Sequence, residues 1–186
     1  ALFSFSLMSD NKGHDHTDAP ADEGVSMTRL ESWIKSNDRF CIGVGDHVFP
    51  NKDRWINQME NDPFFHSNFY PIIGDHDNET KYIYGSSSTQ DKWGRGWVLF
   101  QALDNFFSRP DVEFRPKQAG KINNNGTLYD DQLVDYYAQR QESGFTFHII
   151  ATHFGDASVF ADRTRAWMMN KINTIGATKT DKDVVI

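Results

Sequence analysis

The sequence predicts an α/β fold in which a central mixed β-sheet is flanked by helices. Three observations support this prediction: the apolar runs are short, polar loops rich in Asp and His follow them, and amphipathic helical stretches lie between them. Strands that alternate with helices favour parallel pairing with right-handed crossovers, which places helices on the sheet. Because the chain has 186 residues, we expect one domain that spans residues 1–186.

Apolar runs mark the candidate strands. They lie at Leu2–Met8, Phe40–Val44, Phe69–Ile73, Phe145–Ala151 and Asp183–Ile186. The last run has the character of a strand that is cut short by the end of the chain. Aromatic residues make up 14% of the sequence, which indicates heavy aromatic packing between the layers of the fold.

Helical spacing of apolar residues occurs between these runs. Thr28 and Glu31 fit a capping box at the start of a first helix, and Gly176 fits a C-terminal cap for the last one. Further helices are predicted at residues 52–60, 97–107, 130–141 and 162–175. The segment Asn123–Gly126 is typical of a turn or hairpin tip.

The charge of the chain limits its partners. A net charge of −7 argues against nonspecific binding to nucleic acid or to an anionic membrane, because both need basic surface. Acidic side chains also repel a phosphate ester, unless bound cations invert the local field. The single Cys41 permits no internal disulfide, and its place in an apolar run favours a buried thiol.

The first residues carry no initiator Met and no charged segment. The chain opens on Ala1 within an apolar run, so we expect that upstream residues, such as a signal peptide, have been removed. No apolar run approaches the roughly 18 residues of a membrane span. The expectation is a soluble protein whose compartment, secreted or not, stays open.

Asp and His residues follow the apolar runs where strands of a sheet would end. These residues are Asp10, Asp46, Asp75, His76 and His153. Ligands of open α/β sheets bind at the carboxyl ends of the strands, so we expect one sheet to bring these residues to one edge. Carboxylates and imidazoles suit divalent ions such as Mn, Fe, Zn or Mg. Two such ions about 3.5–4 Å apart activate water and neutralise a phosphoryl group.

The order of these motifs resembles the calcineurin-like metallophosphoesterase family, especially its purple acid phosphatase branch. The chain carries, in sequence, Ser9-Asp10, Gly45-Asp46, Gly74-Asp75-His76-Asp77 and Thr152-His153. The resemblance covers nearly the whole chain and is most specific in the two middle motifs. It implies a layered α/β sandwich, one or two divalent metal ions, and hydrolysis of a small-molecule or protein phosphate ester.

The resemblance also implies roles for individual residues. Asp10 would bind the first metal, and Asp46 would bridge both metals. Asp75 and His153 would bind the second metal.

The residues implied to contact the substrate lie next to these ligands in the sequence. His76 would stabilise the transition state or protonate the leaving oxygen, and Asp77 would hold the imidazole in the right tautomer. His47 fits contact with the substrate and a helix cap equally well. Arg95 is a candidate for binding the phosphate, and Lys12 is a further candidate for contact with the substrate.

The chain also departs from the family pattern. Lys12 stands where the family has a metal-binding His, and a protonated ammonium has no lone pair for a cation. We expect Lys12 to replace the charge of the first metal; the alternative is that it faces solvent while His14 or His16 binds the metal. Asp75 replaces an Asn, and the C-terminal Gly-His-x-His motif is absent before the chain stops at Ile186.

These departures keep a second function open. The rival is a degenerate, non-catalytic relative that binds a ligand or a partner through the same pocket. We therefore expect this 186-residue chain to be a weak phosphatase or an inactive one. One histidine outside the motifs, His148, lies within an apolar run, which is typical of a satisfied core histidine.

Overall fold

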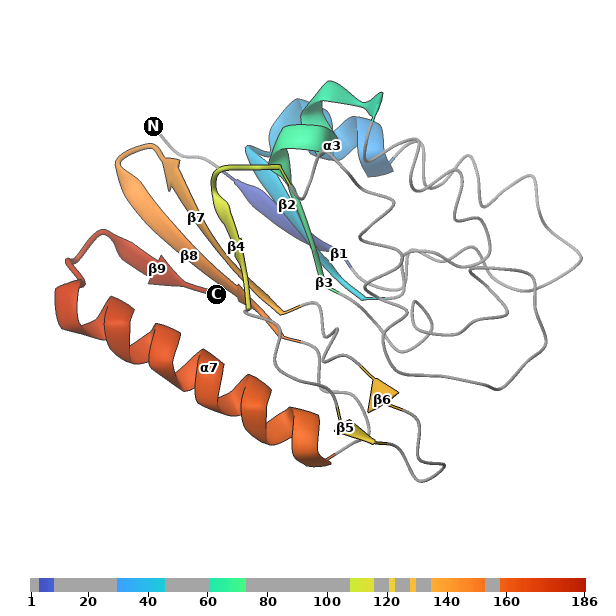
Figure 1. Ribbon diagram of the computed structural model, residues 1–186. Helices are drawn as coiled ribbons and strands as arrows, with labels where there is room; N and C mark the ends of the chain where they lie inside the picture. Colours follow the sequence, from blue (N-terminus) through green and yellow to red (C-terminus); the bar gives the residue numbers. More distant parts are fainter. Residues whose placement is uncertain are drawn as a thin grey trace, which may run out of the picture.

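The described part of the chain has a layered α/β architecture. The computed structural model describes residues 4–8, 30–45, 61–72, 108–115, 121–122, 128–129, 135–152 and 158–186. Two β-sheets face each other, and helices lie on the outer side of each sheet (Figure 1). The predicted α/β class is therefore confirmed.

The two sheets differ in how their strands pair. The first sheet is parallel and has the order β1 (Phe5–Met8), β2 (Phe40–Val44), β3 (Phe69–Ile72). The second sheet is mixed and has the order β4 (Val112–Phe114), β7 (Tyr136–Glu142), β8 (Phe145–Ala151), β9 (Asp183–Val185). A separate antiparallel ribbon joins β5 (Lys121–Ile122) and β6 (Leu128–Tyr129).

The predicted single sheet is wrong, because β8 does not pair with the first three strands. It pairs with β7 through a hairpin and with β9 on its other side. Short connections make hairpin partners adjacent, whereas parallel partners need a crossover. The strands predicted at residues 40–44 and 145–151 nevertheless have the predicted bounds, and β9 confirms the strand at the end of the sequence.

Helices cover both outer faces of the sandwich. A helix over residues 30–37 and α3 (Pro63–Asn68) lie against the first sheet, and α7 (Ser158–Thr178) runs along the second (Figure 1). Asp62 caps α3 by accepting hydrogen bonds from the backbone N–H groups of Phe64 and Phe65, at 2.9 and 3.3 Å. The predicted helices at 52–60 and 97–107 lie outside the described residues.

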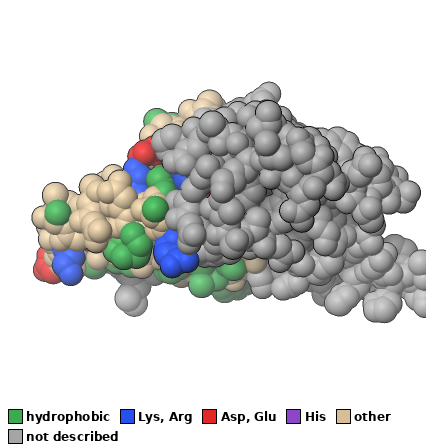
Figure 2. Space-filling model, turned by 60° about the horizontal axis from the view of Figure 1, so that its bottom comes forward, with side chains coloured by type: hydrophobic (Ala, Val, Ile, Leu, Met, Phe, Trp, Pro, Cys, Tyr) green, Lys and Arg blue, Asp and Glu red, His purple; other side chains and the backbone are tan. Residues whose placement is uncertain are grey.

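The surface of α7 mixes polar and apolar side chains. Met169 and Ile172 are 46% and 38% exposed. Hydrophobic groups on the described face in Figure 2 form separate patches between polar and charged ones. Across the described ranges, no helix has both the length and the apolar character needed to cross a membrane.

Aromatic side chains fill the space between the sheets. The ring of Phe147 from β8 meets the rings of Phe5 and Phe40 edge-on, with centroids 5.9 and 5.1 Å apart. Phe5 and Phe40 stack on each other at 4.8 Å. The expected aromatic packing between layers is therefore confirmed. Cys41 is buried as predicted, and this burial, followed by the nearby Asp38 charge, raises the pKa of its thiol to about 12.

A polar cluster joins the last strand of the first sheet to the start of β4. The guanidinium of Arg109 lies 4.4 Å from the ring centroid of Tyr70 and donates to the carbonyl oxygen of Phe69 at 2.8 Å. Arg109 and the Tyr70 hydroxyl both donate to the Asp111 carboxylate. Burial raises the pKa of Asp111, but hydrogen bonds and charge from Arg109 outweigh it and hold that pKa below its usual value.

The helix predicted over residues 130–141 is wrong where the structure describes it, because residues 136–142 form β7. Tyr136 and Ala138 are buried while Gln139 is exposed, which follows the period of two of a half-buried strand. The strand turns back through Ser143 and Gly144, with φ angles of 52° and 85°. Two positive φ angles in a two-residue loop are the geometry of a tight hairpin turn.

Replacement of Gly144 or Gly176 by alanine should change the free energy of unfolding in opposite directions, although both glycines have open space around them. A Cβ at Gly144 or at Gly176 would meet no atom within 4 Å. Gly176 is not the predicted cap, because α7 continues to Thr178. We expect Gly144→Ala to lower the free energy of unfolding by about 1–2 kcal/mol through its positive φ. Gly176→Ala should raise it by about 0.5–1 kcal/mol, since alanine favours a helix interior.

Chemical denaturation of the two variants and the wild type checks this pair. A Gly144→Ala variant as stable as the wild type would show that the hairpin turn does not need a left-handed residue. A Gly176→Ala variant that loses stability would show that the helix ends before this position.

Candidate functional site

The carboxyl ends of the three parallel strands lie side by side. Met8 at the end of β1 is level with Gly43 in β2, and Val44 at the end of β2 is level with Ile72 at the end of β3. Strands in a parallel sheet run in one direction, so the segments that follow β1, β2 and β3 leave from one edge. Loops at this edge of an α/β sheet are where ligands commonly bind.

The second sheet brings the end of β8 to the same side. The Tyr136 hydroxyl donates to the carbonyl oxygen of Pro71 at 2.9 Å, next to the end of β3. Four residues along β7, the Arg140 side chain donates to the carbonyl oxygen of Arg39, just before β2 starts. The strand β7 therefore runs opposite to β2 and β3. Because Ala151 pairs with Tyr136, β8 ends beside the end of β3.

We call this place the carboxyl edge, defined by the strand ends at Met8, Val44, Ile72 and Ala151. The predicted site residues themselves lie outside the described residues: Asp10, Lys12, Asp46, His47, Asp75, His76, Asp77, Arg95 and His153. Each of the four motifs begins within three residues of a described residue at this edge. Within the described ranges, no group of three or more His, Cys, Asp or Glu is arranged to hold a metal.

A buried ion pair lies next to the carboxyl edge, directly before β7. The Asp135 carboxylate accepts hydrogen bonds from Arg115 Nε and from the Thr164 hydroxyl, each at 2.7 Å. The side chains of Arg115 and Asp135 are 3% and 0% exposed. Asp135 directly precedes Tyr136, the partner of Ala151, while Thr164 belongs to α7. Asp135 therefore adjoins the strand pair that leads into segment 153–157, and its carboxylate contacts the helix that follows this segment.

Sequence reasoning missed this ion pair. Arg115 and Thr164 lie 20 and 29 residues from Asp135 along the chain. No local pattern relates such distant positions, and a lone Asp beside an aromatic pair is compatible with a helix cap or a turn. Only the three-dimensional pairing of β7 with β8 and the packing of α7 place these residues together.

The core histidine predicted at position 148 is confirmed, and it belongs to a second polar cluster. His148 is buried, with Nδ1 2.7 Å from the Tyr137 hydroxyl and Nε2 3.0 Å from Asp183 Oδ1. A carboxylate can only accept, so Nε2 carries a proton toward Asp183. Hydrogen bonds from Thr180 and then from His148 lower the pKa of Asp183 to about 2.

The buried ion pair predicts unequal losses of stability. Thr164→Val keeps the volume but removes one hydrogen bond to a charged group, so the free energy of unfolding should fall by roughly 1.5–3 kcal/mol. Asp135→Ala takes the carboxylate away from buried Arg115 and should cost roughly 3–5 kcal/mol. Urea denaturation measures both losses, with the exposed Asp181→Ala as a matched control. Equal stability of Asp135→Ala and the control would contradict a structural role.

The comparisons with known proteins identify no relative. The chain matches no protein-family model, no curated protein and no solved structure.

Proposed function

We propose that this chain hydrolyses a phosphate ester with metal-activated water at the carboxyl edge. The observation that carries the proposal is the coincidence of four strand ends, each directly before an Asp- or His-bearing motif. Unrelated turns would distribute such motifs over both ends of the sheets. The proposed substrate is a small-molecule or protein phosphate ester.

The donor set fits a divalent ion. Asp10, Asp46, Asp75 and His153 offer carboxylate oxygens and an imidazole nitrogen, which suit Mn, Fe, Zn or Mg. When bound, such an ion supplies Lewis acidity and lowers the pKa of water. Binding of cations also removes the repulsion that a chain of net charge −7 would exert on a phosphate.

The remaining residues divide the work on the substrate. His76 would give a proton to the leaving oxygen, and Asp77 would keep its imidazole oriented. Arg95 would bind the phosphate oxygens, and His47 would contact the substrate. These roles come from the family resemblance and are proposed for this chain.

The architecture supports the same proposal. Two facing sheets with helices outside form an α/β arrangement that is compatible with the layered sandwich of the proposed family. The strand β9 runs parallel to β8, and the Ile150 N–H donates to the Ile186 carbonyl oxygen at 3.0 Å. In a longer protein, residues after Ile186 would continue toward the carboxyl edge. A Gly-His-x-His motif there would complete the metal ligands.

Lys12 is proposed to fill the place of one metal. Asp10 and Asp46 would face each other, and uncompensated carboxylates at short range are costly. The Lys12 ammonium would neutralise them but would not activate water. The proposed catalyst is then a one-ion site with weak turnover. A site that holds an ion without turning over substrate is the degenerate alternative.

Metal content and turnover of variants test this function. The wild type should bind one Mn²⁺ per chain and slowly hydrolyse an aryl phosphate. Lys12→His should bind a second ion and turn over faster, and Lys182→His, at an exposed lysine before β9, should match the wild type. Asp46→Asn should lower kcat/KM roughly 100-fold, by analogy with the loss of one electrostatic group.

Three outcomes would count against parts of the proposal. Two ions in the wild type would show that Lys12 does not replace a metal. One ion without any turnover, in wild type and Lys12→His alike, would favour the binding relative. Absence of metal binding together with absence of turnover would contradict the proposed function itself.

A further inference from the structure

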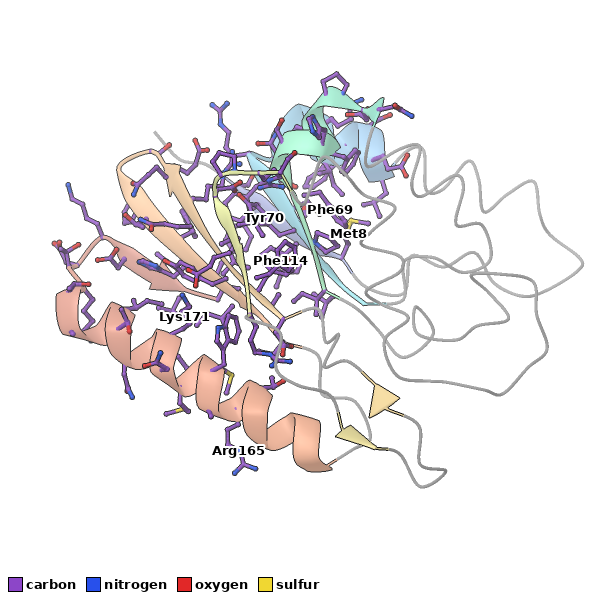
Figure 3. All side chains as sticks on the ribbon, in the orientation of Figure 1. Met8, Phe69, Tyr70, Phe114, Arg165 and Lys171 are labelled. Carbon is purple, nitrogen blue, oxygen red and sulfur yellow. The ribbon has the colours of Figure 1, made fainter. Side chains whose placement is uncertain are left out.

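A pocket that is open to solvent lies between α7 and the second sheet. Its volume is about 400 Å³, and it lies between the C-terminal half of α7 and the outer face of β4, β7, β8 and β9. Protein interiors are normally close-packed, and a helix covers a sheet with apolar side chains. Here the side chains of α7 that line the pocket are polar, except for Ile175. Lys171 reaches from α7 toward the strands, whereas Arg165 points away (Figure 3).

The carboxylates in this pocket are already occupied. Both oxygens of Glu113 accept hydrogen bonds from Lys171 Nζ, at 2.6 and 2.7 Å. One oxygen of Asp183 faces His148, and the other accepts from the backbone and hydroxyl of Thr180. The acidic groups therefore have little capacity left for a cationic ligand.

The side chains of the pocket that can still bind a ligand are hydrogen-bond donors. Lys179 lines the pocket, and its ammonium forms no ion pair with any described residue. The Gln139 side-chain oxygen lies 3.5 Å from the Tyr137 hydroxyl, and no described residue accepts a hydrogen bond from the two amide N–H groups of Gln139. The Lys179 ammonium and the Gln139 amide N–H groups therefore favour a ligand with oxygen atoms that accept hydrogen bonds.

We propose that this pocket binds a small organic monoanion, a carboxylate, with its apolar part against Ile175. The Lys179 ammonium and the Gln139 amide would donate to the carboxylate oxygens, which is a charge-assisted arrangement. Glu113 and Asp183 would repel a ligand with several negative charges. A volume of about 400 Å³ lies within the usual range of small-molecule pockets.

The pocket is separate from the proposed phosphoesterase site. It is lined by Thr146 and Asp183, near the starts of β8 and β9, whereas the carboxyl edge lies at the far end of β8. Binding in the pocket therefore does not depend on metal ions or on the residues of the four motifs. The two proposals can fail independently of each other.

Titration of the ¹⁵N-labelled, metal-free chain with benzoate tests the pocket, with benzamide as the uncharged analogue. We expect saturable shifts of the amide resonances of Lys171, Thr178 and Asp183, with a millimolar or lower Kd. Benzamide should bind at least about tenfold more weakly, and so should benzoate to Lys179→Met. Lys182→Met, which removes an exposed lysine outside the lining, should leave the Kd unchanged.

Other results would overturn the proposal. Benzoate shifts that do not saturate, or that occur away from α7 and β9, would show that the pocket is not a binding site. Equal affinity for benzoate and benzamide would show that the negative charge of the ligand does not contribute to binding. Equal affinity of Lys179→Met and Lys182→Met would show that Lys179 is not the anion-binding residue.

Discussion

The packing of Phe147 against Phe5 and Phe40 holds the two sheets together, and the rest of the architecture depends on it. A buried aromatic side chain contributes roughly 1.5–3 kcal/mol through the removal of its surface from water. Apolar contact alone does not fix how the two sheets are aligned, because apolar side chains can pack in more than one relative position of the sheets. The hydrogen bond from the Tyr136 hydroxyl to the Pro71 carbonyl oxygen is directional. It fixes the position of β7 along β3 and so places the end of β8 beside the end of β3.

This alignment brings four strand ends together, and the sequence predicts Asp and His ligands directly after them. The buried Asp135 carboxylate, directly before β7, then contacts α7 through Thr164 and the end of β4 through Arg115. Such an ion pair is costly to form but more costly to break, because loss of one partner leaves a buried charge without its counter-ion. The outer face of the second sheet has a different character, since its contact with α7 is polar and leaves a pocket.

Much of the fold could be predicted from the sequence, because strands at residues 40–44 and 145–151 are short apolar runs between polar loops. The hairpin was missed because Tyr136 and Tyr137 fit helical and strand spacing equally over so few residues. Sheet membership and the Asp135 ion pair depend on contacts across tens of residues, which no local pattern encodes. For the site, the sequence predicts the types of residue and their order along the chain. The structure adds that the four strand ends lie close together. The roles of Asp10, Asp46, Asp75 and His153 stay predictions.

Paramagnetic broadening by Mn²⁺ in an NMR spectrum tests the carboxyl edge as a metal site most directly, since broadening falls steeply with distance from the ion. Substoichiometric Mn²⁺ should broaden the amide resonances of Met8, Gly45, Ile72 and Thr152, which come from both sheets. The resonances of Ser143 and Gly144, in the hairpin turn at the other end of β8, should stay sharp. Broadening centred on the hairpin turn, or broadening near one of the four strand ends but not the others, would contradict a metal site at the carboxyl edge.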